Sequence, residues 1–113
     1  AGELGERGFN VVTATSYRMV PVASLSREVC DAFAGHRIRA VLHYSRRSAR
    51  AFLDAARAGG VEISALAVPQ CCLSDGVAAV LRDGGAPSVA VARAPDESAL
   101  FEALDRALRP LSR

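Results

Sequence analysis

The residues with the clearest chemical potential lie near the middle of the chain, where an apolar run meets a polar cluster. Residues 38–42 are mostly apolar, and residues 44–48 read Tyr-Ser-Arg-Arg-Ser, after which a helical pattern begins. A strand that leads directly into a helix places the first backbone N–H groups of that helix beside the hydroxyls of Ser45 and Ser48. Together with the positive end of the helix dipole, these groups predict a binding site for a carboxylate or phosphate.

The same residues also have a simpler interpretation. Ser45 and Ser48 suit a helix cap whether or not a ligand binds, and Arg46, Arg47 and Arg50 suit a solvated first turn. Arginines at the positive end of a helix are mildly unfavourable, which favours an anionic ligand nearby. The sequence leaves both interpretations open.

Two further polar segments are expected at the same edge of the sheet, because ligands of open parallel sheets bind at the carboxyl ends of the strands. These are residues 17–21 and 69–74. Tyr17 is either a plain strand tyrosine or a hydroxyl at the edge of the domain. His43 is at a strand end and could titrate near neutrality. No acidic residue is close in sequence to orient it, which favours a structural role.

The adjacent cysteines Cys71 and Cys72 precede an expected helix start, where a thiolate would be stabilised. A Cys-x5-Arg phosphatase loop needs arginine six positions later, and those positions hold Val77 and Ala78. That chemistry is excluded, but a thiol-dependent enzyme remains a hypothesis. With Cys30 as the third cysteine, there is no C-x-x-C motif or Cys/His quartet, so no metal site is expected. Unpaired cysteines indicate a reduced, cytoplasmic setting.

Composition narrows the function further. A chain of 113 residues, half of them hydrophobic, fits one small domain with a single core. All fourteen basic residues are arginine, so Schiff-base and P-loop lysine chemistry is excluded. A GC-rich genome explains this bias as well as a need to bind carboxylates does. The net charge of +2 is too small to indicate a nucleic-acid partner, and no apolar run approaches the roughly 20 residues of a membrane span.

The elements that position these residues alternate between strand and helix. The fold class predicted is α/β, with a parallel flavodoxin-like sheet and flanking helices. Ser74 is the expected N-cap of the third helix, and residues 69–74 are expected to form a loop. The strands are expected at 9–20, 38–43, 63–68 and 88–92, with Pro21 ending the first, and the helices at 24–34, 46–58, 75–81 and 97–108.

In this order, the segments resemble the C-terminal half of uroporphyrinogen-III synthase, in a divergent form associated with α-proteobacteria. The matching pieces are Tyr-Arg-Met-Val-Pro at 17–21, Ala-Val-Leu-His-Tyr-Ser at 40–45, Ser-Ala-Arg-Ala-Phe at 48–52 and Val-Ala-Val-Ala-Arg-Ala-Pro at 89–95. The resemblance implies one incomplete domain of a two-domain synthase. Residues 1–21 would be the end of a helix and a crossover strand from the missing domain, and residues 22–113 the flavodoxin-like domain. A half-enzyme would expose a sheet edge and self-associate.

The resemblance also implies an activity. These lyases close the linear tetrapyrrole hydroxymethylbilane to uroporphyrinogen III, with inversion of ring D and loss of water, and use no metal or organic cofactor. The partner would be this small polycarboxylate in the cytoplasm, with no nucleic acid and no membrane. Ser45, Arg46, Ser48 and Ser74 would bind its carboxylates, and the fragment alone would be inactive.

The sequence departs from the family pattern at the site. The usual Ser-Pro-Ser elbow reads Ser-Arg-Arg-Ser at 45–48, the Gly-x-Thr-Ala turn is replaced at 68–74, and residues 49–52 lack the tyrosine found in some members. The catalytic residue is therefore unassigned, with Tyr17 as the candidate. The alternative is a non-catalytic flavodoxin-like module that binds a small anion or a partner protein.

Overall fold

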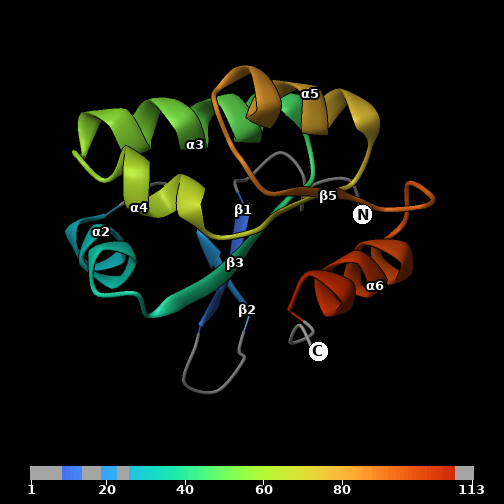
Figure 1. The fold of residues 1–113 in the computed structure, drawn as a ribbon, viewed down its shortest axis with the longest axis horizontal. Helices are drawn as coiled ribbons and strands as arrows, with labels where there is room; N and C mark the ends of the chain where they lie inside the picture. The colour runs from blue at the N-terminus through green and yellow to red at the C-terminus, as the bar shows by residue number, and fades with distance from the viewer. Residues whose placement is uncertain (1–8, 14–18, 23–25, 109–113) are drawn as a thin grey trace.

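The fold is organised around a mixed β-sheet. The computed structural model describes residues 9–13, 19–22 and 26–108 (Figure 1). Within these ranges the sheet has five strands in the order β2-β1-β3-β4-β5. Strands β3, β4 and β5 run parallel, while β1 is antiparallel to both of its neighbours. The strands are β1 Phe9–Thr13, β2 Met19–Val22, β3 Ile38–His43, β4 Gln70–Cys72 and β5 Val89–Val91.

Helices cover both faces of this sheet, which confirms the predicted flavodoxin-like α/β fold (Figure 1). One face packs against α2 to α5 around buried residues such as Phe52 and Leu81. The other face packs against α6 around Leu42 and Leu100. The helices are α2 Arg27–Ala34, α3 Arg46–Ala58, α4 Glu62–Ala67, α5 Asp75–Asp83 and α6 Glu97–Leu108.

The expectation of one long strand over residues 9–20 was wrong. The structure has two antiparallel strands there, β1 and β2, with Val11 opposite Val20. Pro21 was expected to end the strand, but it lies inside β2. It is tolerated because β2 is at the edge of the sheet, where one side of the strand needs no hydrogen-bonding partner. The expected sheet was wholly parallel, so the antiparallel pairing of β1 is a second correction.

The expected strand over residues 63–68 was also wrong, because this segment forms the helix α4. Ala65 and Leu66 are buried while Ile63 is 88% exposed. Such an amphipathic, alanine-containing segment packs one side and is well suited to a helix. The strand lies instead at Gln70–Cys72, inside the expected loop, with Cys71 in register with Leu42. The other predicted elements are confirmed, with ends that shift by a few residues.

Candidate functional site

The polar segment after β3 forms the N-terminus of α3. The Ser45 hydroxyl accepts a hydrogen bond from the Ser48 amide at 3.1 Å, and the Ser48 hydroxyl donates to the Ser45 carbonyl at 3.1 Å. Both serines therefore act in the helix cap, as the simpler interpretation held. The amides of Arg46 and Arg47 lie in the first turn, where a helix provides no backbone acceptor. They remain the donors that an anion would find there.

A second helix begins beside the first. The Ser74 hydroxyl accepts from the Val77 amide at 3.4 Å, which confirms Ser74 as the N-cap of α5. The Leu73 amide donates to the His43 carbonyl at 3.1 Å, and β3 and β4 are parallel neighbours. The starts of α3 and α5 are therefore adjacent at the carboxyl edge of the sheet.

Arg46 joins these two helix starts. A Cβ atom placed on Gly76 would lie 3.6 Å from Arg46 Cδ, 3.9 Å from Arg46 Nε and 3.9 Å from Ser74 Oγ. The Arg46 side chain thus comes from α3 and lies against the first turn of α5. The structure brings Ser45, Arg46, Ser48 and Ser74 together, although Ser48 is only 4% exposed. We call the two helix starts with Arg46 the anion edge.

Tyr44 lies next to the anion edge and connects three elements. Asn10 in β1 donates its side-chain amide to Tyr44 Oη at 3.0 Å, and Tyr44 Oη donates to Glu97 Oε2 at 3.4 Å. Burial raises the pKa of Tyr44, and the charge of Glu97 raises it further. Sequence reasoning missed Asn10 and Glu97, because they are distant in sequence from Tyr44 and carry no local motif.

His43 precedes Tyr44 but is fully buried. Gln70 Nε2 donates to the carbonyls of Ala65 and Val68 at 2.8 and 2.9 Å, so Gln70 Oε1 faces His43 Nε2 at 2.7 Å. His43 must then carry its proton on Nε2. Its Nδ1 is the buried side-chain atom without a hydrogen-bond partner in the described residues. Burial lowers the pKa of His43 to about 4, which supports the structural role expected from the sequence.

The comparison with known proteins decides the family. The chain matches the model of the uroporphyrinogen-III synthase HemD family over residues 1–102. It belongs to the uroporphyrinogen-III synthase family. The resemblance drawn from the sequence segments is thereby confirmed. Neither a curated protein nor a solved structure matches the chain.

The cysteines of this synthase-family chain do not provide a reactive thiol at the anion edge. Cys71 and Cys72 lie in strand β4, between β3 and β5, and are fully buried. Burial raises the pKa of each thiol to about 12. The expected thiolate and the thiol-dependent enzyme hypothesis were wrong, because the residues belong to a strand and not to a loop at a helix start.

Three further expectations concern Tyr17, metal binding and membrane spans. Tyr17 lies outside the described residues. Across residues 9–13, 19–22 and 26–108, no group of three or more His, Cys, Asp or Glu residues could hold a metal ion. In the same ranges, no helix is long and apolar enough to cross a membrane.

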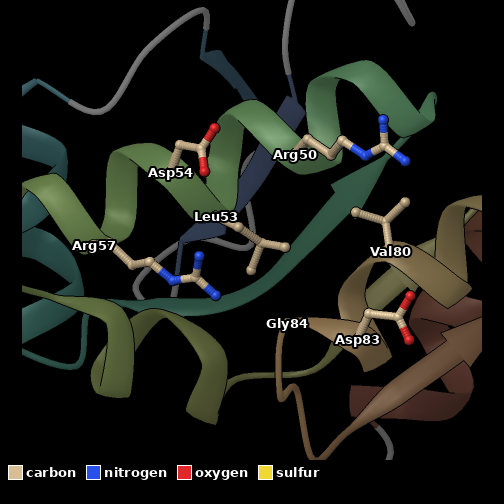
Figure 2. A pocket seen from close by; sticks show the side chains of 7 residues that line it. All are labelled: Arg50, Leu53, Asp54, Arg57, Val80, Asp83 and Gly84. Carbon is tan, nitrogen blue, oxygen red and sulfur yellow. The ribbon is translucent and has the colours of Figure 1, made fainter.

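A shallow groove follows the seam between α3 and α5 beyond the anion edge (Figure 2). Its volume is about 260 Å³. Figure 2 shows Arg50 and Arg57 on either side of Leu53, with Val80 and Asp83 of α5 facing them. Arg57 Nε also pairs with Glu62 at 2.8 Å. The groove carries both signs of charge, and the helix starts carry Arg46 and Arg47 on α3 and Asp75 in the first turn of α5.

Proposed function

We propose that this chain is the C-terminal part of a uroporphyrinogen-III synthase that closes hydroxymethylbilane to uroporphyrinogen III, with inversion of ring D and loss of water. The observation that supports this most is the anion edge. There, two helix N-termini and the Arg46 side chain converge. A linear tetrapyrrole with several carboxylates needs such donors, and membership of the family supplies the reaction.

In the proposed complex, the ligand carboxylates lie at the first turns of α3 and α5. The amides of Arg46 and Arg47, and the guanidinium of Arg46, hold them with charge-assisted hydrogen bonds. Ser45 and Ser74 keep the two helix starts in place. The Ser74 hydroxyl can donate its proton to a carboxylate, while the buried Ser48 accepts the hydroxyl proton of Ser45. Catalysis is then mainly the folding of the substrate, so that its hydroxymethyl carbon comes close to the substituted position of ring D.

The proposed reaction needs no metal or organic cofactor. A tyrosine, or a carboxyl group in its protonated form, would assist the departing hydroxyl by donating a proton, so that water leaves. Tyr17 stays the candidate from the sequence for this step. We place the reaction in the cytoplasm, as a step of tetrapyrrole and haem biosynthesis.

The proposal includes a second domain across the anion edge. Residues 1–21 would bring the chain over from the missing domain as the end of a helix and a crossover strand, with β1 and β2 joining the sheet, and residues 22–113 would form the rest of the flavodoxin-like domain. The chain alone would then be inactive and would self-associate through a free sheet edge.

The test is isomer analysis of the uroporphyrinogen formed from freshly generated hydroxymethylbilane. Spontaneous closure gives isomer I, so isomer III reports catalysis. The assay is run with the chain alone and with the N-terminal half supplied as a second polypeptide. We expect isomer III only in the second case. Isomer III from the chain alone would overturn the proposed inactivity, and isomer I in both cases, with both halves folded, would leave a non-catalytic anion- or partner-binding module.

A further inference from the structure

The hydrogen-bond chain through Tyr44 has a direction. Asn10 donates to the Tyr44 oxygen, which leaves the Tyr44 hydroxyl proton to point toward Glu97. Each donor in the chain therefore points toward the Glu97 carboxylate. This carboxylate lies in the first turn of α6, where the helix dipole favours a negative charge. Asn10, Tyr44 and the N-terminus of α6 thus all favour the negative charge of Glu97.

Glu97 retains most of its capacity to accept hydrogen bonds. An ionised carboxylate has about four lone-pair sites, and Tyr44 uses one of them. Glu97 is solvent-exposed. The Tyr44–Glu97 hydrogen bond is 3.4 Å long and orients the Glu97 carboxylate without fixing the start of α6. By contrast, Asp96 fixes the start of α6 through a 2.8 Å bond to the Ala99 amide.

The Glu97 carboxylate limits which ligands can bind next to the anion edge. Tyr44 directly precedes Ser45, so Glu97 lies close to the anion edge. A ligand with only negative groups would be repelled by Glu97. A ligand that brings an N–H donor to this position gains a charge-assisted hydrogen bond instead. The two neighbouring sites together therefore select a molecule with both carboxylates and N–H groups.

We propose that Glu97, positioned by Tyr44 and Asn10, accepts hydrogen bonds from pyrrole N–H groups of a ligand whose carboxylates occupy the anion edge. The inference rests on the proposed function for the class of ligand. It adds a specificity-determining acceptor from α6 to donors that come from α3 and α5. Asn10 and Tyr44 are positioning residues in this arrangement.

The test uses two probes that differ only at nitrogen. One is a dipyrromethane that carries acetate and propionate side chains, and the other is its N,N′-dimethyl derivative. Binding to the chain is measured by isothermal titration calorimetry. We expect the N–H probe to bind about tenfold more tightly, as for one hydrogen bond to a charged group. Glu97→Gln should remove most of this preference, and Tyr44→Phe should reduce it.

The matched control is Glu102→Gln, which removes an exposed carboxylate from the same helix and should leave the preference unchanged. Methyl groups add bulk in every variant, so the change in preference between wild type and Glu97→Gln isolates the hydrogen bond. Equal binding of both probes, no binding of either, or an undiminished preference in Glu97→Gln would overturn the inference. Isomer III formation without an N–H preference would leave the synthase function standing. An N–H preference that needs Glu97, with isomer I only, would remove the synthase function and retain the acceptor site.

Discussion

His43 and Tyr44 are consecutive polar residues at the end of β3, yet they have opposite environments. The His43 ring is fully buried beside Phe52, with ring centroids 5.0 Å apart, and its hydrogen-bond partner is the neutral Gln70. Tyr44 points to the other face, where it packs near α6 and reaches the charged, exposed Glu97. Alternation along a strand separates them. The residue type alone therefore does not indicate the role of a polar residue at a strand end. That role depends on which face of the sheet the side chain lies on.

The largest effect is expected from removing the aromatic packing around His43. Phe52→Ala removes a fully buried ring that contacts Phe9, Phe33 and His43. We expect the free energy of unfolding to fall by about 3–5 kcal/mol, measured by urea denaturation. The control is Phe101→Ala, at a position 37% exposed, which should cost much less. Equal losses at both positions would contradict the described core.

The pH dependence of stability tests the same burial. The pKa of His43 falls from its ordinary value of 6.5 to about 4 on folding, so between these values the unfolded chain binds more protons. Stability from this residue is therefore complete above pH 6.5 and is lost as the pH falls toward 4, by about 3 kcal/mol in total. Urea denaturation at several pH values measures it. His43→Leu should remove this part of the slope, whereas His36→Gln, on an exposed turn, should not.

A smaller effect is expected on the pKa of Tyr44. The pKa of Tyr44 is raised by burial first and by Glu97 second. Glu97→Gln should lower this pKa toward its ordinary value without restoring it, because the burial remains. Ultraviolet absorbance during alkaline titration reports the phenolate, and a Tyr17→Phe background leaves Tyr44 as the tyrosine observed. An unchanged pKa in Glu97→Gln would mean that the two side chains do not interact in solution.

The parts of the fold that were predictable from the sequence are those with local signals. Ser45 and Ser74 precede helical patterns and act as caps, and the apolar run before His43 is a buried strand. The apolar run at 63–68 was misleading because a short buried segment does not distinguish strand from helix. Strand β4 has only three residues, too few for a periodic pattern.

The candidate site was predictable to the same extent. The helix starts could be located from Ser45 and Ser74, and their approach follows from parallel strands ending at one edge. The contacts of Asn10 and Glu97 with Tyr44 span 34 and 53 residues. No spacing rule covers such distances, because they depend on how β1 and α6 pack. Gln70 was missed for a similar reason, since its role depends on the position of α4.

Gly84 sets the separation of two helices at a point far from where they act. A Cβ atom at this position would lie 2.6 Å from Cδ1 of Leu53, so the end of α5 rests directly against the middle of α3. The other ends of these helices frame the anion edge. A methyl group added at Gly84 would meet the end of the Leu53 side chain, so Leu53 would have to turn away for the two helices to keep their spacing. The close packing of α5 on α3 at this point therefore depends on a position without a side chain.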